Sequence, residues 1–154
     1  MTILVIGMGN PDCGDDAVGR LVARALRGRL LQGVRIEEAD GVATSLLARL
    51  DGVEAAYLVD ACVSGAAPGA LHRFDASHAP LPAARFGVST HGMGLADALE
   101  LARTLGTLPS LCVVYAVEGS SFAPGTPVSP AVARALPLVA ERLCRDIADA
   151  LTQA

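Results

Sequence analysis

The sequence lacks the long apolar runs and the clusters of basic residues that mark membrane proteins and nucleic-acid-binding proteins. No apolar run approaches the roughly 18 residues that a membrane span requires, and no basic segment precedes the first apolar stretch. The 12 basic residues are scattered and the net charge is -4, so no patch could neutralise a nucleic-acid backbone. We therefore expect a cytoplasmic protein that binds neither membranes nor nucleic acid.

Cysteine is also scarce, and its spacing excludes two kinds of architecture. The four cysteines, Cys13, Cys62, Cys112 and Cys144, are too few and too far apart for a disulfide framework, and none forms a C-x-x-C pair typical of zinc knuckles. We expect Cys112 and Cys144 to be buried thiols. The chain also has no G-x-S-x-G sequence, the turn that carries the nucleophile of many serine hydrolases.

Apolar sequence is abundant, and it comes in short segments that alternate with segments of helical period. With 52% apolar residues and no break in composition, residues 1–154 are expected to form a single domain with one core. The alternation predicts an α/β fold, a three-layer α/β/α arrangement around a twisted, mostly parallel sheet of about five strands. Strands are predicted at residues 3–6, 34–37, 55–61, 70–74 (antiparallel or at an edge) and 111–117, and helices at 17–31, 42–50, 91–105 and from 129 onward.

The turn between the first strand and the first helix is crowded with carboxylates. Asp12, Asp15 and Asp16 lie within five residues of one another in a glycine-containing loop, where like charges repel. Water can offset this repulsion on an exposed loop, and a cation or a substrate group can do so in a cleft. The run alone leaves both explanations open. Within it, Asp12 and Asp15 are expected to be accessory, with Asp15 capping the following helix.

Topology brings one of these aspartates together with two distant residues. In a doubly wound sheet the first strand and the strand at 55–61 lie side by side, and ligands bind where their carboxyl ends meet. Asp16 and Asp60 emerge there, and His91 begins the helix after a long loop. Two carboxylates and an imidazole form a ligand set that suits Ni, Zn, Mn or Fe better than Cu(I). Each residue also has a purely structural explanation, as a helix cap, a strand-end acceptor or a helix N-terminal residue.

Several motifs of the chain resemble those of the hydrogenase maturation proteases, the endopeptidases that trim the large subunit of nickel-iron hydrogenases. The resemblance runs nearly from end to end. The motifs that carry it lie at residues 5–10, 15–19, 40–41, 59–61 with 68–69, 89–97, and 122–125 with 129–130.

The resemblance implies a metal site and a reaction. In that family the acid of the first motif, the aspartate ending the third strand and the histidine of the later motif form the metal site, which corresponds to Asp16, Asp60 and His91. The first acid is an aspartate here, where some members have glutamate. The family removes a short C-terminal extension from the large-subunit precursor after metal insertion, and recognises nickel carried by that precursor. The same three residues are the expected catalytic residues, and either Asp16 or Asp60 can be the general base.

Other functions fit the sequence less well. A dinucleotide-binding module would need a third glycine at position 12, where Asp12 stands, and Asp15 and Asp16 would face a pyrophosphate with the wrong charge. Cys13 is a poor candidate nucleophile, because a thiolate is disfavoured beside three carboxylates. A non-catalytic nickel-binding assembly protein with the same ligands remains the alternative.

Two further expectations concern the remaining histidines and one loop. His72 and His78 are predicted to be surface residues, since one lies in an edge strand and the other in a proline-rich loop. The loop at 118–128 can be either a plain connection or a lid over the substrate.

Overall fold

The computed structural model describes residues 1–29, 32–40, 43–82 and 94–153. Five strands form one sheet in the order β2-β1-β3-β5-β4. The first four of these run parallel, and β4 pairs antiparallel with β5 at the edge. The strands are β1 (Ile3–Met8), β2 (Val34–Ala39), β3 (Ala55–Cys62), β4 (Leu71–Asp75) and β5 (Leu111–Glu118).

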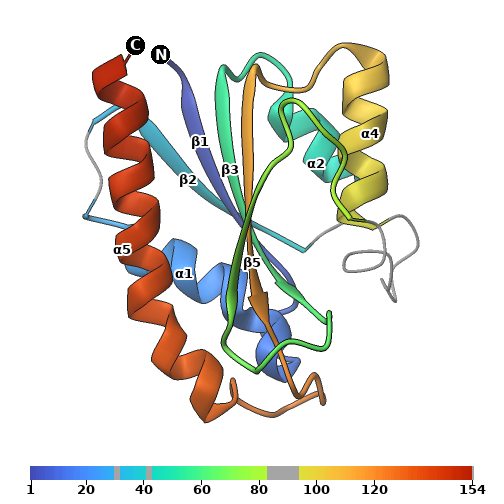
Figure 1. The fold of residues 1–154 in the computed structure, drawn as a ribbon, viewed down its shortest axis with the longest axis vertical. Coiled ribbons are helices and arrows are strands. Elements are labelled where there is room, and N and C mark those ends of the chain that lie inside the picture. The colour runs from blue at the N-terminus through green and yellow to red at the C-terminus, as the bar shows by residue number, and fades with distance from the viewer. Residues whose placement is uncertain (30–31, 41–42, 83–93, 154) are drawn as a thin grey trace.

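Helices cover both faces of the sheet, so the predicted three-layer α/β/α fold is confirmed. Figure 1 shows α1 and α5 on one face and α2 and α4 on the other. The helical elements are the 3-10 turn η1 (Gly14–Ala17) and the helices α1 (Val18–Leu26), α2 (Ala43–Leu50), α4 (Leu95–Leu105) and α5 (Pro130–Gln153). None of the helices in the described ranges is both long and apolar enough to cross a bilayer.

The central strands are buried on both faces because their residues are apolar in both alternating sets. Along β1 every residue is buried, as a central strand between two helical layers requires. Leu4 and Ile6 pack toward α2 and α4, whereas Ile3 and Val5 pack in the core cluster that includes α1 and α5. The predicted antiparallel edge strand is also confirmed, as β4.

Some predicted boundaries and burial assignments differ from the structure. Helix α1 ends at Leu26 instead of residue 31, because the chain becomes extended at Arg27 and Gly28 then has a φ of 83°. Helix α4 begins at Leu95 and ends before a left-handed Gly106, while the predicted start at residue 91 lies outside the described residues. Cys112 is buried as predicted, but Cys144 is partly exposed on α5.

Candidate active site

The turn after β1 closes on the side chain of Asp16. The Asn10 backbone N–H donates to Asp16 Oδ2 at 2.8 Å, and the Asp16 N–H donates to the Cys13 carbonyl at 3.1 Å. Gly9 has a φ of 125°, and a Cβ at this position would lie 1.9 Å from the Asp16 carbonyl oxygen. A glycine is therefore required for the turn to fold back this tightly, and the turn places Asp16 just beyond the end of β1.

A second glycine brings this turn against β3. A Cβ on Gly19 would lie 2.2 Å from the Val59 carbonyl oxygen and 2.4 Å from that of Met8. The first turn of α1 thus packs directly on the backbones of β1 and β3, which a larger residue would prevent. Because of this close approach, η1 and its residue Asp16 lie at the end of β3, where Asp60 is located.

Asp60 lies at the carboxyl end of β3 and is partly buried. Its Oδ1 accepts a hydrogen bond from the Ala61 N–H at 2.8 Å. Burial raises the pKa of Asp60 to about 7, the negative charge of Asp16 adds to the rise, and the hydrogen bond from Ala61 opposes it. The two carboxylates therefore lie near enough to interact, and near neutral pH Asp60 can hold or release a proton. That they form one site with His91 stays a prediction.

His91, the third predicted ligand, lies outside the described residues. Of the remaining candidates in the turn, Asp12 is exposed and Cys13 is partly buried. The Asp12 N–H donates to Asn10 Oδ1 at 2.9 Å, so the backbone of Asp12 helps to shape the turn that holds Asp16.

Asp15 does not cap its helix, contrary to the prediction. It is 0% exposed, and its carboxylate accepts backbone N–H bonds from Ser120 at 2.8 Å, Ser121 at 3.1 Å and Ser129 at 2.6 Å. The Ser129 hydroxyl adds a further bond at 3.0 Å. Burial raises the pKa of Asp15, but these hydrogen bonds outweigh burial and hold the pKa below its usual value. Asp15 is the anchor of the loop between β5 and α5.

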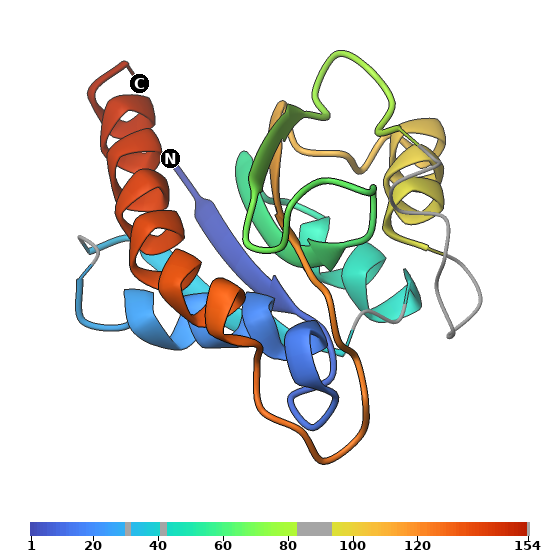
Figure 2. The same cartoon turned by 60° about the horizontal axis from the view of Figure 1, so that its bottom comes forward.

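That loop is attached to the site at several further points. The Gly125 N–H donates to the Asp12 carbonyl at 2.6 Å, the Gly14 N–H donates to the Thr126 carbonyl at 3.1 Å, and Asp15 N–H donates to the Ser121 carbonyl at 2.8 Å. Figure 2 shows the loop passing beside η1. Hydrogen bonds therefore join this loop to the turn that carries Asp12, Asp15 and Asp16. This anchoring agrees with the first of the two predictions for the loop, a plain connection between β5 and α5.

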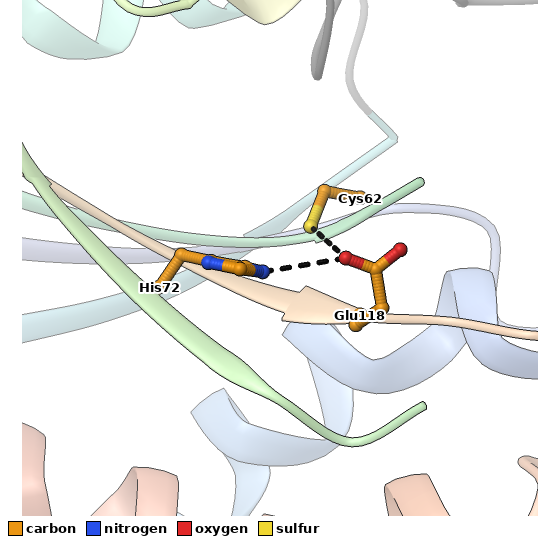
Figure 3. Close-up of side chains that lie close together, drawn as sticks. All are labelled: Cys62, His72 and Glu118. Atoms are coloured by element: carbon orange, nitrogen blue, oxygen red, sulfur yellow. Dashed lines mark hydrogen bonds and ion pairs between the residues drawn. The ribbon is translucent and has the colours of Figure 1, made fainter. Parts of the chain in front are cut away.

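Sequence reasoning missed one cluster of side chains beside this site. His72, predicted as a surface residue, is partly buried, and its Nε2 lies 3.3 Å from Oε1 of the buried Glu118. Cys62 Sγ lies 3.6 Å from the same oxygen. Figure 3 shows the three side chains pointing toward one another from β3, β4 and β5. The only hint in the sequence is that Cys62 follows Asp60 by two residues, so that both are on the same face of β3.

Comparison with known proteins assigns the chain to a family. Residues 22–146 match the family model HycI, described as hydrogenase maturation protease. The chain is 30% identical over 135 residues to hydrogenase 2 maturation protease of Escherichia coli strain K12, covering 86% of this chain and 82% of that protein.

Solved structures of such proteins share the fold. The hydrogenase maturating endopeptidase HybD from E. coli aligns with a TM-score of 0.78 and 25% identity, over 97% of this chain and 94% of that chain. The nickel-iron hydrogenase maturation protease HycI from Thermococcus kodakarensis aligns with a TM-score of 0.70 and 23% identity, over 94% and 90% of the two chains. The sequence match and the shared fold agree with the motifs around Asp16 and Asp60, and the chain belongs to the hydrogenase maturation protease family.

Proposed function

We propose that this protein is a nickel-recognising endopeptidase that removes the C-terminal extension of a nickel-iron hydrogenase large-subunit precursor after the metal centre has been inserted. Membership of the maturation protease family supports a protease that acts in hydrogenase maturation. The single observation that carries the proposal further is the environment of Asp60 at the end of β3, where burial and, next to it, the negative charge of Asp16 in η1 raise its pKa to about 7.

In this proposal Asp16, Asp60 and His91 contact the nickel of the bound precursor. Asp16 is fixed by the Asn10 N–H, and Asp60 is fixed by the Ala61 N–H, so both carboxylates are oriented before the substrate arrives. Three protein ligands leave coordination positions open for water and for ligands from the precursor. A site of this kind, without thiolate, is expected to hold nickel weakly unless the precursor contributes ligands of its own.

Asp60 is the better candidate for the general base. In the protein without bound nickel, the carboxyl group of Asp60 has a pKa of about 7, so it can accept and release a proton at neutral pH. An aspartate at the ordinary pKa of 3.8 would be a much weaker base. We therefore assign proton transfer to Asp60. Asp16, Asp60 and His91 together bind the nickel of the substrate.

The decisive experiment compares two forms of one precursor. Enzyme stripped of metal by a chelator is incubated with nickel-free or nickel-loaded large-subunit precursor, and the mass of the large subunit is followed. We expect the nickel-loaded form to lose its extension and the nickel-free form to remain intact. Equal processing of both forms would contradict nickel recognition, and stable co-elution without any mass change would instead identify a non-catalytic assembly protein.

Matched variants test which residues precursor processing requires. Asp16→Asn and Asp60→Asn should each abolish processing, because each removes a charged ligand at unchanged volume. Asp149→Asn, which changes an exposed carboxylate on α5, should process the precursor at the rate of the unaltered protein. Cys13→Ala should also remain active. If this variant is inactive but still binds nickel, the Cys13 thiol takes part in catalysis.

A further inference from the structure

The cluster of Cys62, His72 and Glu118 lies where the register of three strands brings its members together. Cys62 at the end of β3 is paired directly with Glu118 at the end of β5. His72 on β4 is paired with Ala116, two residues before Glu118 on the same face of β5. The three side chains thus come from three different strands, and Figure 3 shows them meeting at Glu118.

The two distances that end on Glu118 Oε1 match edges of a tetrahedral metal site. One ligand atom from each residue lies within 4.8 Å of the others. A tetrahedral zinc ion would separate an imidazole nitrogen from a carboxylate oxygen by about 3.4 Å, and a thiolate sulfur from that oxygen by about 3.6 Å. The observed separations are 3.3 Å from His72 Nε2 to Glu118 Oε1 and 3.6 Å from Cys62 Sγ to the same oxygen.

Hydrogen bonding alone accounts poorly for this arrangement. Besides Cys62 and His72, the Ser64 hydroxyl lies 2.5 Å from Glu118 Oε1, so three polar groups converge on one oxygen that has two lone pairs. The carboxylate oxygen Oε2 accepts the Ser64 N–H at 2.7 Å. The two bonds from Ser64 are the shortest at Glu118, and the contacts from Cys62 and His72 are longer, at lengths that also suit two ligands of one ion.

The charge and burial of Glu118 favour a cation at the cluster of Cys62, His72 and Glu118. Glu118 is only 2% exposed, and within the part of the chain that the structure describes its one ion-pair partner is the imidazole of His72. Burial raises the pKa of Glu118, but the hydrogen bonds from Ser64, His72 and Cys62 outweigh burial and hold the pKa below its usual value. The group is therefore a buried carboxylate, whose desolvation a bound divalent cation would compensate.

We infer that Cys62, His72 and Glu118 form a binding site for a divalent cation of the zinc type, separate from the proposed nickel contacts of Asp16, Asp60 and His91. Thiolate, imidazole and carboxylate together select zinc over magnesium or calcium, which prefer oxygen ligands alone. Binding releases the proton of the Cys62 thiol, and a fourth position stays open to water. The ion would link the ends of β3, β4 and β5.

Cobalt(II) is the probe that tests this site, because it replaces zinc and gives a sulfur-to-cobalt absorption when a thiolate binds it. Chelator-stripped protein is titrated with Co²⁺ alone, and the near-ultraviolet and visible spectra are recorded. We expect that absorption in the unaltered protein, with intense visible bands typical of tetrahedral coordination. Cys62→Ser should lose the sulfur-to-cobalt absorption, and His72→Gln should weaken cobalt binding by more than about tenfold.

Two controls make the result decisive. Cys13→Ser removes the other thiol near the carboxyl ends of the strands and should keep the full absorption. Circular dichroism reports whether Cys62→Ser folds, and His72→Gln, at a partly exposed position on an edge strand, decides the question if it does not. The inference is overturned if the unaltered protein gives no sulfur-to-cobalt absorption, if the absorption and affinity persist in the folded variants, or if Cys13→Ser abolishes the absorption. None of these outcomes depends on precursor processing, so the proposed function is tested separately.

Discussion

Replacing Asp60 by Asn should make the protein more stable at pH 8, although it removes a proposed functional group. Asn keeps the side-chain volume and an oxygen that can accept the Ala61 N–H, so the fold is preserved. What changes is the charge, which in the folded protein is partly buried and faces Asp16. Stabilisation by this substitution would show that the site holds Asp60 at a cost to folding, as functional sites commonly do.

The size of the effect follows from the two pKa values of this carboxyl group. The ordinary value is 3.8, which applies to the unfolded chain, and the folded value is about 7. Between these pH values the folded protein keeps a proton that the unfolded chain has released, so the contribution of Asp60 to the free energy of unfolding falls as pH rises. A difference of about 3 units corresponds to at most about 4 kcal/mol, and partial exposure reduces it to about 1 to 3 kcal/mol.

Urea unfolding followed by circular dichroism measures this difference. Asp60→Asn and the unaltered protein are compared at intervals from pH 4 to pH 8 in the presence of a chelator, with Asp149→Asn as the exposed-carboxylate control. The two stability curves should meet near pH 4 and separate progressively up to about pH 7, whereas the control should follow the unaltered protein. Equal stability at pH 8, or a gap that does not change with pH, would refute the assignment of a raised pKa to Asp60.

Three further outcomes are expected. Asp15→Ala should lower the free energy of unfolding by about 3 kcal/mol, because it leaves buried donors unpaired, and should expose residues 120–128 to limited proteolysis. An unchanged digestion pattern would contradict the anchoring role. Gly19→Ala should lower the melting temperature, since its Cβ would lie 2.2 Å from the Val59 carbonyl oxygen, and wild-type stability would disprove that close approach. Nickel affinity in calorimetry should fall as pH drops below about 7 and should be weaker in Asp60→Asn; an affinity that is independent of both would remove Asp60 from the ligand set.

The sequence by itself determined the fold class and the positions of the two central carboxylates. The apolar runs of β1 and β3 specify buried parallel strands, and parallel strands end at the same edge of a sheet. Asp16 lies in the turn after β1 and Asp60 near the end of β3, so their approach could be predicted from local pattern and a general rule of topology. The motifs around them also carried the family resemblance that the comparisons bear out.

Tertiary structure alone decided the environment of those carboxylates. The raised pKa of Asp60 depends first on its burial and then on how close η1 brings Asp16, and that approach rests on the packing of Gly19 against two strands. Nothing in the strand pattern states how deeply a side chain at a strand end is buried. Desolvation depends on all the atoms around a group, including those from distant parts of the chain.

The contacts of Asp15 and His72 likewise could not be predicted from the local sequence. Asp15 resembles a helix cap in the sequence, but its partners at Ser120 and Ser129 are 105 and 114 residues away. His72 resembles a surface residue until β4 pairs with β5 and places it beside Glu118, 46 residues later. Local periodicity reports which side of an element is apolar. It carries no information on which distant polar groups will meet, because that depends on strand order, register and loop path together.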